Sequence, residues 1–180
     1  RLQIWNMGFE NHSPRENKRL NKDLSSEVIQ AGVVAVRKLS SDFPDSFGFD
    51  GWGTILYTPW TRPDDLRINF REIRSRTPRD ARFALGTALQ LLPGLPVSLL
   101  AEADGLLVKA FEDLPTDSGC IISWDGYELP WRFQDPSVAR MYQLTRRFLS
   151  RGIIPDDDPL FFQVQAWLSS LPAPARKDPI

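Results

Sequence analysis

The stretch WGTILYTPWTRPDDLRINFREIR, residues 52–74, decides the fold because it holds a strand, a turn and the beginning of a helix in direct succession. Residues 52–57 are rich in the β-branched, aromatic and aliphatic side chains that strands favour. The strand is predicted to end at Thr58. Thr61 then offers a capping hydroxyl and Pro63 an early proline, with an acidic residue in the first turn. The stretch therefore predicts a strand that leads directly into a helix.

The same alternation of strand and helix extends to both sides of this stretch. Apolar spacing and turn residues predict strands over residues 1–7 and 82–92, helices over residues 26–39 and 96–103, and a loop over residues 11–22. Ser25 or Ser26 is available to cap the first of these helices, while Gly48 and Gly51 predict an irregular connection before residue 52. Strands separated by helices imply parallel pairing, so the predicted class is α/β, with a barrel or a doubly wound sheet.

Beyond Gly105 the pattern is less regular. Residues 106–111 are compatible with a strand, and residues 115–127 predict a loop rich in Gly, Asp and Ser. Two Asp-Pro pairs, at Asp135 and Asp158, predict the starts of two further helices. The predicted units are a βα region over residues 1–111, an irregular region over residues 112–134, a helical extension over residues 135–171 and a flexible tail over residues 172–180.

Composition and charge exclude several classes of protein. The hydrophobic content is 42%, and no apolar run approaches the roughly 20 residues that cross a bilayer. The net charge of −1, from 22 Lys plus Arg and 23 Asp plus Glu, argues against nucleic-acid and membrane partners. The one cysteine, Cys120, fits a reducing cytosol, and with the one histidine, His12, it cannot form a Cys/His metal cage. We expect a soluble, cytoplasmic chain, without a secretion signal at Arg1 and without its own metal site.

In parallel βα folds, ligand-binding residues gather in loops at the C-terminal ends of strands. The first such loop contains Glu10 and Asn11, whose carboxylate and amide can hold hydroxyl or amine groups of a ligand. In the alternative interpretation, the Asn and Ser side chains of this loop only satisfy local backbone groups.

The second loop contains Tyr57, Thr58, Trp60 and Thr61, beside a predicted helix start. Its aromatic faces suit stacking on a planar ligand, and the helix start suits a carboxylate or phosphate group. A helix cap with two packed rings is the alternative. The third loop, residues 93–96, is interpreted chiefly as a tight turn.

Other residue patterns give weaker indications of chemistry. The three aspartates at residues 156–158 precede a helix start, where capping explains them better than a metal site does. His12 has no companion histidine and no G-x-S-x-G motif, which argues against a hydrolase triad. Glu10 with a later acid such as Glu102 leaves an unrelated acid/base enzyme as an alternative.

Four segments in a fixed order carry a resemblance to a known family. They are GFENHSPRENKRLNKDLS, GWGTILYTPWTRPDDLRINF, LLPGLPVSLLAEADGLL and ELPWRFQDPSVARMY, and they span roughly residues 2–150. Their order resembles the later barrel of radical S-adenosylmethionine enzymes that also carry a cobalamin-binding domain. In that family a glycine-glutamate loop precedes a lysine-bearing run, and a PxDL helix, a PGxPL turn and a DPxVARLY-like helix follow.

This resemblance implies a partial (β/α) TIM-type barrel with parallel strands, followed by C-terminal helices. It implies that S-adenosylmethionine lies across the strand ends beside a [4Fe-4S] cluster, and that a separate N-terminal domain holds cobalamin. The implied reaction is a radical-based modification, with methylation as one outcome, of a small-molecule or peptide substrate. The positions matched to cofactor-binding loops are Glu10, Asn11, Tyr57 and Thr58, and those assigned to substrate contact are Trp60 and Thr61.

The chain departs from the family at the cluster. The three cysteines of the family's CxxxCxxC loop are absent, and Cys120 lies in the wrong region. One expectation is the C-terminal part of such an enzyme, whose partner is the N-terminal half with the cluster and the cobalamin domain; a chain that begins in mid-strand favours it. The alternative is a non-catalytic half-barrel that binds a ligand or a partner. In neither case is this chain expected to be active alone.

Overall fold

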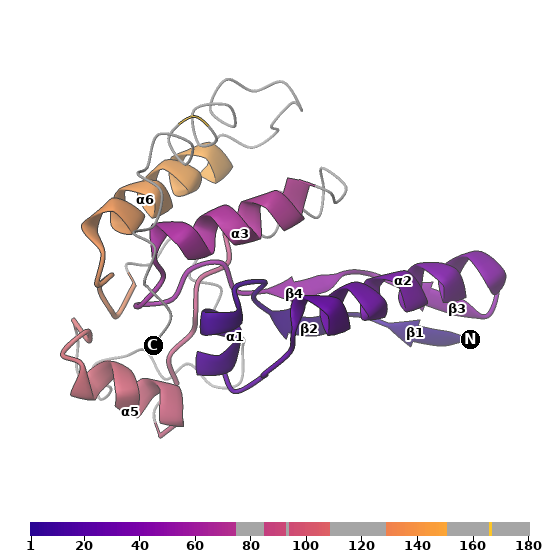
Figure 1. The fold of residues 1–180 in the computed structure, drawn as a ribbon, viewed down its shortest axis with the longest axis horizontal. Helices are drawn as coiled ribbons and strands as arrows, with labels where there is room; N and C mark the ends of the chain where they lie inside the picture. The colour runs from indigo at the N-terminus through magenta and orange to yellow at the C-terminus, as the bar shows by residue number, and fades with distance from the viewer. Residues whose placement is uncertain (75–84, 93, 109–128, 151–165, 167–180) are drawn as a thin grey trace, which may run out of the picture.

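A computed structural model describes residues 1–74, 85–92, 94–108, 129–150 and 166 of the chain (Figure 1). The strands are β1 (Leu2–Ile4), β2 (Met7–Glu10), β3 (Phe47–Phe49) and β4 (Trp52–Thr54). The helices are α1 (Pro14–Arg19), α2 (Ser26–Asp42), α3 (Pro63–Arg74), α5 (Pro96–Ala103) and α6 (Pro136–Ser150).

The strands form two parallel pairs along neighbouring stretches of the chain. β1 pairs with β3, with Leu2 opposite Phe47, and β2 pairs with β4, with Gly8 opposite Gly53. The register of the second pair is irregular between Gly8 and Glu10. Each pair joins a segment before α2 to a segment after it, so α2 serves as the crossover connection of a parallel sheet.

The parallel direction continues beyond β4. Tyr57 forms a parallel bridge with Ala88, supported by hydrogen bonds from Leu56 N–H to the Thr87 carbonyl (3.1 Å) and from Leu89 N–H to the Tyr57 carbonyl (2.7 Å). Three segments therefore run parallel in chain order, separated by α2 and α3. The predicted α/β class with parallel strands is confirmed, although the described residues do not close a barrel.

The predicted helix starts agree with the structure because each depends on local signals. Helices α2, α3, α5 and α6 begin at the predicted serine or proline. Ser25 accepts a hydrogen bond from Val28 N–H at 3.3 Å, as the capping prediction required. Asp135 accepts one from Ser137 N–H at 2.8 Å at the start of α6.

The predicted loop over residues 11–22 is wrong, because it contains α1. Pro14 occupies the first turn, where its missing N–H has no cost, and Glu16 adds an acidic group there. The helix buries Glu16 and Asn17 rather than apolar residues. Its buried face therefore leaves no hydrophobic periodicity in the sequence.

The predicted strand boundaries are also partly wrong. Residues 1–7 form parts of two strands separated at Trp5 and Asn6, and the predicted irregular connection around Gly48 contains β3. Strand β4 ends at Thr54, before the predicted end, although Tyr57 still forms a bridge. The predicted strand over residues 82–92 is wrong for its described part, residues 85–92, which contains only the bridge at Ala88. Strand limits depend on partners distant in the sequence, which explains why local patterns misplace them.

The buried apolar residues lie in two parts of the molecule, with α1 between them. Figure 1 shows β1–β4 and α2 on one side of the molecule, and α3, α5 and α6 on the other. Ile29, Val33 and Val36 of α2 are buried on the first side. The second side holds the main core, whose largest members include Tyr57, Leu66, Trp131, Val138 and Met141.

Several predictions fall outside the described residues. These are the predictions for residues 82–84, for most of residues 106–134, and for the helix after Asp158 and the tail. Within the described part of the chain, no helix is both long enough and apolar enough to cross a membrane.

Candidate functional site

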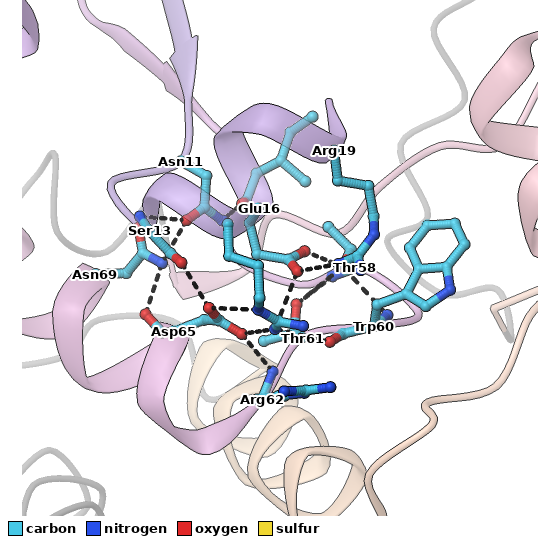
Figure 2. Close-up of polar contacts among 12 residues, drawn as sticks. Asn11, Ser13, Glu16, Arg19, Thr58, Trp60, Thr61, Arg62, Asp65 and Asn69 are labelled. Carbon is cyan, nitrogen blue, oxygen red and sulfur yellow. Dashed lines mark hydrogen bonds and ion pairs between the residues drawn. The ribbon is translucent and has the colours of Figure 1, made fainter. Parts of the chain in front are cut away.

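Two strand-end loops meet in one polar network. The first loop follows β2 and leads into α1, and the second follows the Tyr57 bridge and leads into α3 (Figure 2). Both lie at C-terminal ends of parallel segments, which is where ligand sites form in such folds. The buried polar residues that these loops and helices bring together are Asn11, Ser13, Glu16, Asn17, Thr58, Thr61, Asp65 and Asn69.

The turn after β2 is strained and firmly held. Glu10 ends the strand with a φ of 64°, in the left-handed region that non-glycine residues rarely adopt. Its carbonyl accepts a hydrogen bond from Ile55 N–H at 2.5 Å, and the Asn11 side chain donates to the Ile55 carbonyl at 2.8 Å. The turn is thereby attached to the chain that continues β4.

Two further asparagines hold this turn. Nδ2 of Asn17 donates to the carbonyls of Phe9 (2.7 Å) and Asn11 (2.9 Å). Nδ2 of Asn69 donates to Oδ1 of Asn11 at 2.8 Å (Figure 2), and Oδ1 of Asn69 accepts from His12 N–H at 2.9 Å. Because these side chains are buried, water does not compete for the bonds.

The Glu10 side chain differs from its neighbours because it reaches solvent. It is 19% exposed, and its carboxylate lies 3.1 Å from the ammonium of Lys22. A Cβ atom on Gly8 would lie only 2.6 Å from Oε1 of Glu10, so the carboxylate rests on the glycine backbone. The register partner Gly53 is covered in the same way by Asn6, 2.8 Å from where its Cβ would be. This face of the strand pair is built of glycine backbone and polar side chains.

An ion cluster lies beside the turn, centred on Glu16. The buried carboxylate pairs with Arg19 at 2.5 Å and Arg15 at 3.2 Å, and accepts a hydrogen bond from the Thr58 hydroxyl. Burial raises the pKa of Glu16 above its ordinary value of 4.5, an effect that the Thr58 hydrogen bond and the two arginines oppose and that nearby Asp65 reinforces. Burial is the largest of these effects.

Asp65 links the first loop to α3. It accepts hydrogen bonds from Ser13 Oγ at 2.5 Å and from Arg62 N–H at 2.7 Å, and it pairs with Arg15. The bond from Arg62 N–H is one half of a capping box at the helix start. The predicted capping role of Thr61 is wrong, because its hydroxyl accepts from Thr58 N–H at 2.8 Å and so closes the loop before the helix.

The six predicted site residues differ in their surroundings, and five of them are buried. Asn11, Thr58 and Thr61 lie inside the polar network, whereas Tyr57 and Trp60 are buried with the main core. The Tyr57 hydroxyl lies 3.1 Å from Thr145 Oγ1, and burial raises its pKa above the ordinary value, so it remains a neutral phenol. Of the six predicted residues, only Glu10 exposes its side chain appreciably.

Two contacts hold the Trp60 side chain of the second loop in place. Its Nε1–H donates to Asp104 at 2.6 Å, and the Arg19 guanidinium lies 5.0 Å from the ring centroid. Trp60 is only 2% exposed, so its ring does not offer an open face for stacking in this arrangement.

Sequence reasoning missed Arg15, Glu16, Asp65 and Asn69. Asp65 and Asn69 are four residues apart, on the face of α3 that also carries the buried Leu66 and Phe70. Polar residues at helical spacing within an apolar stripe were the available signal. No comparable signal marks Arg15 and Glu16, because every residue of α1 after Pro14 is polar.

The described residues do not supply a metal centre. Among them, no group of three or more His, Cys, Asp or Glu side chains could hold a metal ion. The single cysteine of the chain also cannot provide the three thiolates that a [4Fe-4S] cluster of the expected kind requires. What this site can offer is the Glu10 carboxylate, an acceptor for amine or hydroxyl groups.

Comparison with known proteins found no match among family models, curated proteins or solved structures.

Proposed function

We propose that this chain is the C-terminal part of a cobalamin-dependent radical S-adenosylmethionine enzyme. Its strand-end loops would form one wall of the site for S-adenosylmethionine, within a (β/α) barrel completed by the N-terminal half. Two features support the proposal: the order of the four family-like segments, and the parallel strands in chain order with polar loops at their C-terminal ends.

The observation that carries the proposal is the conformation of Glu10. A non-glycine residue in the left-handed region costs about 1–3 kcal/mol and persists where the surroundings impose it, commonly at ligand sites. Here three buried asparagines impose it, and the result is a partly exposed carboxylate at the end of a parallel strand. Such a carboxylate suits the amine and ribose hydroxyl groups of S-adenosylmethionine.

The implied cofactors fit this chain to different degrees. S-adenosylmethionine fits Glu10 by the chemistry of donor and acceptor. The [4Fe-4S] cluster does not fit, because only one cysteine is present, and we assign it to the N-terminal half. We assign cobalamin to the same half. In the complete enzyme the bound cofactors would supply radical chemistry, whereas the residues of this chain would orient the adenosyl ligand and exclude water.

The test uses the protein encoded by the complete reading frame, reconstituted anaerobically with iron and sulfide. Visible and electron paramagnetic resonance spectra should show the cluster, and a reductant should produce 5′-deoxyadenosine from S-adenosylmethionine. Glu10→Gln should weaken S-adenosylmethionine binding about tenfold, the cost of one charge-assisted hydrogen bond, with the cluster spectrum unchanged. Glu27→Gln, a matched change on the exposed start of α2, should leave binding unchanged.

Two results would contradict the proposal. One is the absence of a CxxxCxxC motif from the reading frame upstream of Arg1. The other is equal affinity of the wild type and Glu10→Gln for S-adenosylmethionine.

The alternative function is a non-catalytic module that binds a ligand or partner. One observation favours this alternative: the polar side-chain groups of the second loop already form hydrogen bonds within the chain, at Thr58, Thr61 and Trp60. Binding of S-adenosylmethionine without its cleavage in the complete protein would support this alternative.

A further inference from the structure

We propose that Asn69 of α3 is a positioning residue that holds Glu10 in its left-handed conformation. The inference rests on the proposed function for the identity of the ligand, but the geometry that it invokes lies within this chain. Asn69 is fully buried and therefore cannot contact a ligand directly. It would act through the two residues that follow Glu10.

Asn69 uses its whole side-chain amide. Nδ2 donates to Oδ1 of Asn11 and to the Asp65 carbonyl, both at 2.8 Å, and Oδ1 accepts from His12 N–H at 2.9 Å. The bond to Asp65 is local to α3, whereas the bonds with Asn11 (Figure 2) and His12 reach across to the turn after β2. Asparagine is the residue of this length that offers donors and an acceptor together.

The two bonds from Asn69 to the turn restrict the backbone conformation of Glu10. The His12 N–H is buried, and an unsatisfied buried donor costs about 1–3 kcal/mol. Oδ1 of Asn11 is shared between Asn69 and Ser13 N–H, and Nδ2 of the same side chain holds the Ile55 carbonyl. Loss of Asn69 therefore loosens the link between the turn and the chain after β4, and the strained φ of Glu10 can relax.

A purely structural role for Asn69 makes a different prediction. In that case Asn69→Ala would lower overall stability, with no local effect at the turn. Ser98→Ala is a matched control, because Ser98 is also fully buried and also anchors backbone, donating to the Leu92 carbonyl at 2.7 Å. Ser98 lies in the first turn of α5, and its hydrogen bond does not involve the turn after β2.

The first experiment measures amide hydrogen exchange by NMR in this 180-residue chain. In Asn69→Ala, exchange at His12, Ser13 and Ile55 should accelerate at least about tenfold relative to amides of α2. In Ser98→Ala, these three amides should keep their protection. Unchanged protection in Asn69→Ala would overturn the inference.

The second experiment measures S-adenosylmethionine affinity in the complete protein by equilibrium dialysis. Asn69→Ala should weaken binding by a similar factor to Glu10→Gln, and the double variant should bind no more weakly than Glu10→Gln alone. Additive losses, or wild-type affinity in Asn69→Ala, would overturn the inference. If the wild type does not bind S-adenosylmethionine, the proposed function fails, and hydrogen exchange alone decides the role of Asn69.

Discussion

Glu16 shows how a single buried residue can make stability depend on pH. Because burial raises its folded-state pKa above 4.5, the folded chain holds the proton more tightly than the unfolded chain. Unfolding then releases a proton, so this contribution to stability is complete below pH 4.5 and is lost as the pH rises through the folded-state pKa. Replacement by Gln removes the titration and keeps the shape.

We therefore predict how the stability difference between the wild type and Glu16→Gln changes with pH. The unfolding free energy of the wild type minus that of Glu16→Gln should be largest at acid pH and should fall as the pH rises. Urea denaturation of both proteins between about pH 4 and pH 8 measures it. A difference that grows with pH would show that the pairs with Arg15 and Arg19 outweigh burial.

The Tyr57 hydroxyl gives a second prediction at the scale of one residue. Tyr57→Phe should cost about 1 kcal/mol, because Thr145 Oγ1 keeps its bond to the Tyr142 carbonyl at 2.9 Å. Thr145→Val should cost more, since it leaves the buried Tyr57 hydroxyl without this partner. Thermal denaturation of the two variants measures the order, and the reverse order would contradict the assignment of the bond.

At the scale of elements, the β2–β4 pair depends on close approach at Gly53. A Cβ atom there would lie 3.1 Å from the Gly8 backbone and 2.8 Å from Asn6, and the backbone cannot easily move aside. Gly53→Ala should therefore destabilise the chain by about 1–3 kcal/mol. Gly51→Ala is the control, because a Cβ at Gly51 meets nothing within 4 Å. Equal melting temperatures for both variants would exclude this tight packing.

The elements also show which parts of the fold the sequence could predict. Helix starts were predictable because the signals, such as Ser25 before α2, act within one turn. Strand β3 was not, because Gly48 weakens its β signal and its pairing depends on β1, some 45 residues earlier in the chain by register (Leu2 with Phe47).

The candidate site was predictable to a similar degree. The two strand-end loops were identified from the order of elements, and the structure brings them together. Their buried partners were not, because burial of Asp65 depends on Ser13, a partner 52 residues away in sequence. Local patterns therefore locate the loops, whereas long-range hydrogen bonds decide which side chains reach solvent.

At the scale of the whole molecule, polar contacts join two apolar groups. The main core extends from Leu56 to Tyr142 and does not include the buried residues of α2. Helix α1 lies between the two sides of the molecule (Figure 1) and carries Glu16, which belongs to the polar network that also contains Asp65 (Figure 2). Satisfied networks of this kind specify one arrangement more strictly than apolar packing does. The relative placement of the two strand-end loops thus depends on hydrogen bonds and ion pairs.

The open side of the parallel strands leads to a prediction about association. Within the described residues, β1 and β2 each pair along one edge only, and two large apolar residues of this part of the chain are exposed, Leu2 of β1 at 61% and Trp5 between the two strands at 77%. Parallel sheets are ordinarily covered, and unpaired strand edges invite pairing with another chain. This 180-residue chain should therefore self-associate as its concentration rises.

Sedimentation velocity over a concentration series tests this expectation. Trp5→Lys should reduce association, because it replaces an exposed apolar ring between β1 and β2 by a charge, which opposes pairing with another chain, whereas Gln30→Lys on the exposed surface of α2 should not. The control matters because both variants add the same charge, so a difference between them reports the position and not the net charge. If Trp5→Lys and Gln30→Lys associate alike, the edge of β1–β2 is not the contact, and the exposed residues of α5 become the next surface to alter.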